Sequence, residues 1–160
     1  MSAFCIRDAR MPDDKQAALE FIMGMQKFEK AIEPDRRVDA SVAAEFFEVI
    51  IKRVKDKNGH IFIAEWETKS IGWAVVYPDE NDIFVEAAKR AFAYISELFV
   101  VEEKRGTGVG RALIAACEDW ARTRGLTVMM LGVLSGNTRA AKIYEDAGYL
   151  PYATQRRKYL

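Results

Sequence analysis

The segment Arg105-Gly106-Thr107-Gly108-Val109-Gly110 combines glycines and a cation at the start of an amphipathic helical pattern, directly after the apolar run 95–100. Glycine lets the backbone approach an anion closely. The first turn of a helix offers unpaired N–H groups and the positive end of the helix dipole. The segment is therefore interpreted as a phosphate-binding loop, with an ordinary strand-to-helix turn as the alternative if it is taken alone.

Two common phosphate motifs do not fit this segment. A Walker loop needs Lys and then Ser or Thr after its last glycine, and Arg111-Ala112 stands there instead. The Rossmann spacing G-x-G-x-x-G, counted from Gly106, reaches Arg111 where a third glycine is required. The remaining pattern is R-x-x-G-x-G, which makes an ordinary ATP- or NAD-binding protein improbable.

A second block, 137–149, has the spacing N-x-x-A-x-x-x-Y-x-x-x-G-[FY], with Asn137, Ala140 and Tyr144 at its polar and small positions. Together the two blocks resemble the GCN5-related N-acetyltransferase (GNAT) superfamily over residues 93–150. The resemblance implies acetyl-CoA as cosubstrate, without a metal. It also implies a mixed α/β fold with a central, mostly antiparallel sheet flanked by helices.

The resemblance further implies which residues hold the cosubstrate. The glycine loop would bind the pyrophosphate, and Asn137 and Tyr144, about two helical turns apart, would lie beside the pantetheine arm. The backbone of 98–101 would bind the pantetheine amides, and an N–H near Val100 could hold the oxyanion. Residues 130–132 would line the other edge of the slot, or form a plain buried strand. The implied cofactor-binding residues are Leu98, Phe99, Val100, Val101, Arg105, Gly106, Thr107, Gly108, Val109, Gly110, Arg111, Asn137, Ala140 and Tyr144.

Transfer to an amine requires a base, because an ammonium group has no free lone pair. Glu97 on the expected central strand is the candidate base, directly or through water, because burial would raise its pKa. A structural carboxylate is the alternative. Tyr144 is the candidate acid for the departing thiolate, because its phenol stays protonated at neutral pH. A half-buried structural tyrosine is the alternative there, and Tyr149 is expected to serve core packing.

The acceptor side is expected to come from the loop between the first two helices and from the segment before the central strand. Both are acidic and lie near aromatic residues, which favours a small cationic amine. A protein or peptide acetyltransferase and a non-catalytic acyl-CoA sensor remain alternatives, and homodimerisation is a family expectation only. The residues concerned are Glu29, Glu33, Asp35, Asp39, Asp79, Glu80, Asp82 and Glu86, with Phe28, Trp73 and Tyr77.

Composition limits the other classes of function. The 160 residues suit one domain, and 24 basic residues balance 24 acidic ones, so no overall field favours nucleic acid or an anionic membrane. Cys5 and Cys117 are too few for a disulfide framework, and Cys117 is expected to be a reduced core thiol. His60 is the only histidine, which argues against a multi-histidine metal site. With no signal-peptide pattern or membrane-length apolar run, a soluble cytoplasmic protein is expected.

The elements that must position these residues follow from apolar periodicity and turn signals. Helical spacing predicts a helix after Pro12, a second helix over 42–54, a long one over 110–124 ending at Gly125, and a short one over 138–147. Strands are expected at 4–10, 61–66, 71–77, 93–101, 127–133 and 152–160, with an extra helical turn or lid between Pro78 and Tyr94.

Overall fold

The computed structural model describes residues 4–160. Five strands form one sheet in the order β1-β2-β3-β4-β5, antiparallel except for the parallel pair β4–β5. The expected mixed α/β fold with an open, mostly antiparallel sheet is confirmed. In chain order the elements are β1 (Cys5–Asp8), α1 (Lys15–Lys30), α2 (Val42–Asp56), β2 (His60–Trp66), β3 (Lys69–Glu80), α3 (Ala87–Arg90), β4 (Ala91–Val100), the 3-10 turn η1 (Glu102–Lys104), α4 (Val109–Thr123), β5 (Met129–Leu131) and α5 (Thr138–Asp146).

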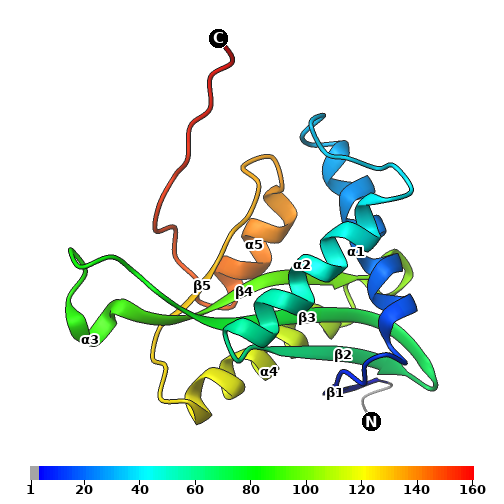
Figure 1. Ribbon diagram of the computed structural model, residues 1–160, viewed down its shortest axis with the longest axis horizontal. Coiled ribbons are helices and arrows are strands. Elements are labelled where there is room, and N and C mark those ends of the chain that lie inside the picture. The colour runs from blue at the N-terminus through cyan, green and yellow to red at the C-terminus, as the bar shows by residue number, and fades with distance from the viewer. Residues whose placement is uncertain (1–3) are drawn as a thin grey trace.

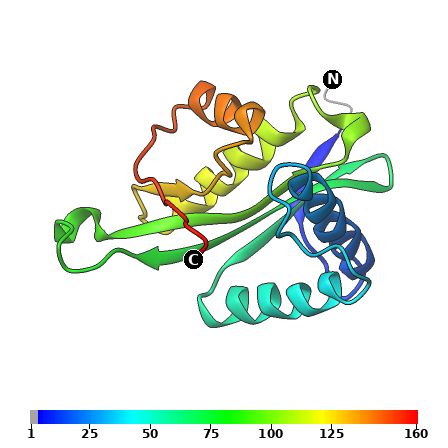
Figure 2. The ribbon, with the colours of Figure 1, turned by 90° about the horizontal axis from the view of Figure 1, so that it is seen from above.

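Helices cover both faces of the sheet. Figure 2 shows α1 and α2 on one side and α4 and α5 on the other. The first layer buries Phe21, Phe47 and Ile50 against Trp73. The second buries apolar residues of α4, including Cys117, whose position in the core is as expected. Apolar faces of amphipathic helices thus meet both faces of the central strands, which fixes the sheet as the middle layer.

A bulge in β4 changes which face its side chains occupy. Val76 pairs with Ile95 and Val75 with Glu97, so Ser96 is an extra residue on β4. Ile95 therefore belongs to the core under α4, whereas Phe99 belongs to the core under α1 and α2. Without the extra residue, Ile95 and Phe99 would share one face, because side chains alternate along a strand. The bulge places Glu97 on the side of α1.

The C-terminal segment differs from its expected structure. Residues 152–160, predicted as a strand, pair with no strand of the described residues and are exposed. Strand propensity alone does not make a strand without a neighbouring backbone to bond. Arg157 instead donates to Glu33 Oε2 at 2.6 Å and Asp35 Oδ2 at 2.5 Å. Figure 2 shows the tail leaving α5 and crossing the sheet toward the side on which α1 and α2 lie.

The segment between Pro78 and Tyr94 is mostly a long hairpin. β3 continues to Glu80 and β4 begins at Ala91, so only the four residues of α3 form the expected helical turn. Ile83 and Phe84 at its tip are exposed. Figure 1 shows this end projecting from the body of the molecule.

No helix among residues 4–160 is both long and apolar enough to span a membrane.

Candidate active site

A cavity of about 530 Å³ lies where β4 and β5 part. The two strands pair as far as Ile95 and Leu131, where β5 ends, whereas β4 continues to Val100. Residues 96–100 therefore have an open edge toward α5. The cavity follows this edge from the glycine loop to the end of α1.

Backbone groups of β4 divide between the sheet and the cavity. The N–H of Val101 donates to Ile71 O at 2.9 Å, so this residue's backbone is committed to β3. Because backbone groups alternate along a strand, Phe99 shares that orientation, while Leu98 and Val100 direct their N–H and C=O toward the open edge. Of the four residues whose backbone groups were expected to bind pantetheine, Leu98 and Val100 direct them toward the cavity, and Phe99 and Val101 use them within the sheet.

The glycine loop has the backbone that an anion site needs. Gly106 has φ of 80° and Gly108, the N-cap of α4, has φ of 90°. Within residues 4–160, a Cβ at either position would have no neighbouring atom within 4 Å. The loop therefore exposes bare backbone in front of the first N–H groups of α4, which have no partner within the helix. Gly106 and Gly110 line the cavity.

The side chains of the loop have different surroundings. Arg105 lines the cavity, donates from Nε to Val100 O at 3.0 Å, and lies over the ring of Phe28 at 5.2 Å. Thr107 donates to Lys104 O. Val109 is buried and anchors the start of α4 in the core. Of the cofactor-binding set, Val101, Thr107, Gly108, Val109 and the exposed Arg111 do not line the cavity.

Helix α5 brings three expected residues to the opposite wall. Asn137 caps the helix by accepting from the N–H of Ala140 at 3.1 Å, and both residues line the cavity. Tyr144 lines the cavity further along the same helix. Burial is the larger cause, and the charge of Glu29 the smaller one, that raises the pKa of its phenol to about 12. Tyr149 lies behind it and donates to Glu118 Oε1 at 3.2 Å.

Glu97 reaches the cavity from the middle of β4. Burial, followed by the negative charge of Glu29, raises the pKa of its carboxyl to about 8, and Arg53 opposes the shift. A half-buried carboxyl with such a pKa can accept and release a proton near neutral pH. Glu97, whose carboxyl titrates near neutral pH, and Tyr144, whose phenol stays protonated there, therefore line one cavity.

Fewer residues of the expected acceptor side line the cavity than the sequence predicts. Phe28 and Glu29 line the cavity. Trp73 and Tyr77 do not, because they are buried at 1% and 5% exposure within the packed layers. The acidic residues of the hairpin lie away from the cavity lining, since β3 and β4 carry them outward.

A protein-family model for the acetyltransferase (GNAT) family matches residues 25–149 of this chain. The chain belongs to the GNAT family. The match contains the glycine loop, β4 and α5, which are the elements that surround the cavity.

Individual relatives agree with this membership. The uncharacterized N-acetyltransferase YhfO of Bacillus subtilis is 31% identical over 61% of this chain and 62% of its own length. A mycothiol acetyltransferase of Thermobispora bispora is 45% identical over 39% of this chain and 22% of its own length. The matches thus span less than two thirds of these relatives. The structure of the tetramutant of BH1408 from Bacillus halodurans shares the fold, with a TM-score of 0.82 at 19% identity over 98% of this chain and 99% of that one.

This GNAT protein also has cavity residues that the sequence motifs did not reveal. Tyr94 and Ser96 lie on β4 before Glu97, Phe46 comes from the apolar stripe of α2, and Gln155 comes from the tail. The sequence pattern around Tyr94 and Phe46 predicts only that they are core residues. Nothing in the sequence signals the bulge at Ser96, because its register depends on pairing with β3.

Proposed function

We propose that this GNAT protein transfers an acetyl group from acetyl-CoA to a primary amine, most simply a small cationic one. The observation that carries the proposal is that Glu97 and Tyr144 line the same cavity as the glycine loop. Acid–base chemistry requires both groups within reach of one reacting centre. Residues 1–160 are proposed to act as one domain in the cytoplasm.

The residues present suit acetyl-CoA, which supplies an electrophilic thioester carbonyl when bound. Gly106, Gly108 and the start of α4 offer backbone N–H groups to a pyrophosphate, with Arg111 nearby as a cation. The open edge at Leu98 and Val100 offers the hydrogen-bond pattern of a missing strand to an extended amide chain. The N–H of Val100 would donate to the oxygen that gains negative charge.

Glu97 would remove the proton of the attacking amine, directly or through one water. A base must be ionised to act. Because burial raises the pKa of Glu97 to about 8, kcat/KM should rise with pH and level off above that value. A more acidic carboxylate would be ionised more often, but it would be a weaker base for an ammonium proton.

Tyr144 would offer its O–H to the departing thiolate. Its phenol, with a pKa of about 12, remains protonated throughout the working range. Since a thiol has an ordinary pKa of about 8.5, full transfer from this phenol is uphill, and Tyr144 acts mainly by hydrogen-bonding the sulfur as charge develops there.

The experiment is acetyl-CoA-dependent thiol release by the purified protein with polyamines, aminoglycosides, amino acids and lysine peptides, with no-acceptor controls. Tyr144→Phe should lower kcat by roughly 10- to 100-fold and leave acetyl-CoA affinity nearly unchanged. Tyr149→Phe is the matched control, because that hydroxyl bonds to Glu118 behind the cavity wall.

Selective activity on lysine peptides would assign a peptide acceptor instead of a small one. Tight acetyl-CoA binding with no transfer to any acceptor, unaffected by Tyr144→Phe and Glu97→Gln, would contradict catalysis and favour an acyl-CoA sensor.

A further inference from the structure

Among the acidic residues expected near the acceptor, only Glu29 lines the cavity. Several of the others are engaged elsewhere. Glu33 and Asp35 pair with Arg157 of the tail. Asp39 pairs with Arg37 on the exposed loop after α1. Of the acidic set expected near the acceptor, Glu29 is therefore the one residue that joins Glu97 on the cavity wall.

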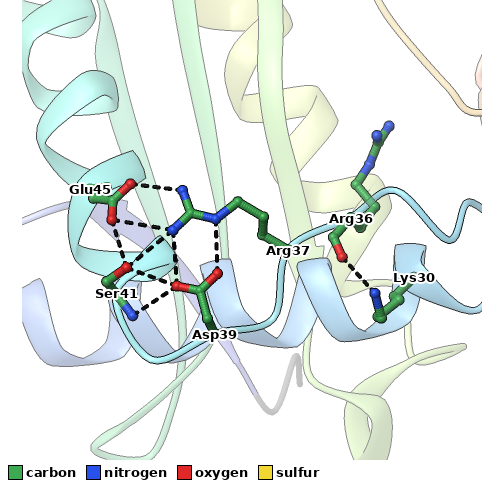
Figure 3. Close-up of polar contacts among 6 residues, drawn as sticks. All are labelled: Lys30, Arg36, Arg37, Asp39, Ser41 and Glu45. Carbon is green, nitrogen blue, oxygen red and sulfur yellow. Dashed lines mark hydrogen bonds and ion pairs between the residues drawn. The ribbon is translucent and has the colours of Figure 1, made fainter.

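The surrounding loop holds Glu29 in place. Glu29 lies in the last turn of α1, and its Oε2 accepts from Arg36 Nε at 2.8 Å. Lys30 donates to the carbonyl oxygens of Pro34 and Arg36, which fixes the turn that carries Arg36. The loop is braced further on by Arg37, which contacts Asp39, Ser41 and Glu45, as Figure 3 shows. A braced loop keeps the carboxylate of Glu29 on the cavity wall before any ligand binds.

Glu97 is the second observation. It lines the same cavity, and within residues 4–160 its side chain makes no hydrogen bond or ion pair that would satisfy it. Glu97 is half-buried, and a carboxylate that has lost part of its hydration without gaining a partner favours protonation or a nearby cation. An ammonium group placed between Glu29 and Glu97 would supply that cation.

The charged and titratable groups around Glu97 come from each element packed against it. They are Glu29 from α1, Arg53 from α2, Tyr77 from β3 and Tyr94 from β4. Glu29 also influences Tyr144 on α5. Glu29 thus acts on both proposed acid–base groups, and it is the anion among these neighbours.

We propose that Glu29 binds the ammonium group of the acceptor and holds it beside Glu97, which makes Glu29 the residue that selects a cationic acceptor. The proposal rests on the proposed function. Arg36 balances Glu29 in the free protein, and the ammonium takes over part of that role on binding. The proton then passes from nitrogen to Glu97, giving a neutral amine and a neutral carboxyl, while Glu29 stays ionised.

The test compares wild type with Glu29→Gln and Glu29→Asp, using spermidine as acceptor. Glu29→Gln should raise the KM for spermidine roughly tenfold, because a charge-assisted hydrogen bond is lost, and leave the KM for acetyl-CoA nearly unchanged. It should also shift the acid limb of the kcat/KM profile to lower pH, because Glu97 loses a negative neighbour. Glu29→Asp should keep the acid limb in place.

The higher KM for spermidine lowers kcat/KM, whereas the shifted acid limb raises the relative activity at low pH. General damage to the fold does not produce both changes. An arylamine that is neutral at pH 7 should show no increase in KM with Glu29→Gln. Glu20→Gln is the matched control on the same helix, because Glu20 bonds to Gln16 on the exposed face, and it should match wild type. An unchanged spermidine KM, or an equal increase for the arylamine, would overturn the proposal.

A measurement without turnover separates this proposal from the proposed function. In protein labelled with ¹³C at glutamate carboxyls, Glu97 is assigned by its loss in Glu97→Gln and titrated in wild type and Glu29→Gln. Its midpoint should fall by roughly one pH unit in Glu29→Gln. If wild type transfers no acetyl group, the proposed function fails and the titration still reports on Glu29. An unmoved midpoint contradicts the pairing of Glu29 with Glu97.

Discussion

At the scale of single residues, burial decides the chemistry of Glu97. The carboxyl is ordinary in sequence, but β4 holds it half-buried on the cavity wall, where the charged form loses part of its hydration and its pKa rises to about 8. The same removal of water raises the pKa of Tyr144 to about 12. Position in the fold therefore gives these two common side chains the pKa values that their proposed roles as base and hydrogen-bond donor require.

Glu97→Gln should stabilise the protein more at high pH than at low pH. Because the folded pKa lies above the ordinary value of 4.5, the folded state holds a proton that the unfolded chain loses. The contribution of Glu97 to wild-type stability is therefore greatest below about pH 4.5 and is lost as pH rises through about 8. Glu97→Gln does not titrate, so its stability relative to wild type should increase by about 4 kcal/mol between pH 5 and pH 9. Urea unfolding of both proteins at each pH measures the difference, and a constant difference would contradict the burial argument.

At the scale of elements, the junctions of α4 and α1 with β4 shape the cavity. Gly108 turns the chain from the loop into α4 through a left-handed conformation. On the other wall, Gly24 lets α1 approach β4, because a Cβ there would lie 2.6 Å from Cζ of Phe99. Gly108 is thus required by its backbone conformation, and Gly24 by the close packing of α1 against β4.

Gly108→Ala should lower the free energy of unfolding by about 1–2 kcal/mol, because alanine is strained at a φ of 90°. Open space around the position excludes a steric contribution. Gly110→Ala is the matched control. Its nearest neighbour, a Val100 side-chain carbon, lies at 3.9 Å, so the change should not lower stability. Urea unfolding tests both, and equal losses in the two variants would contradict the conformational explanation.

Gly24→Ala should destabilise the protein, although Gly to Ala in a helix usually stabilises by about 0.5–1 kcal/mol. The added methyl group meets the ring of Phe99, which is itself packed against Phe21 with ring centroids 5.8 Å apart. Moving a packed ring costs about 1–3 kcal/mol, which outweighs the helix gain. A higher urea midpoint for this variant would show that the ring moves freely.

At the scale of the whole molecule, ion pairs connect the C-terminal tail to the loop after α1. Arg157 pairs with Glu33 and Asp35, and its side chain is 49% exposed. Gln155 lines the cavity, so the tail passes over one side of it. Exposed ion pairs contribute little stability, so the tail is held weakly compared with the layers.

Arg157→Ala should therefore change the free energy of unfolding by less than about 1 kcal/mol. The tail should nevertheless become more mobile, because no buried apolar contact replaces the ion pairs. Lower heteronuclear NOE values for residues 152–160 would show this, with Arg156→Ala as the neighbouring control. Unchanged NOE values would mean that other contacts fix the tail.

The sequence by itself determined the parts that depend on local pattern. The glycine loop, helix α5 and the strand before the loop could be predicted because turn conformation and periodicity are encoded over a few residues. These segments also carry the motifs of the family. The local pattern failed at residues 152–160, because a strand needs a partner as well as its own propensity.

Only the tertiary structure decided how these parts meet. The bulge at Ser96 reverses the alternation of β4 and sends Glu97 toward α1, and that register exists only through pairing with β3. The same long-range packing buries Trp73, removes it from the acceptor side, and leaves Glu29 as the acidic residue of that set on the cavity wall. Burial and charge proximity arise between distant segments, so the pKa values of the site follow from the folded chain and not from its local sequence.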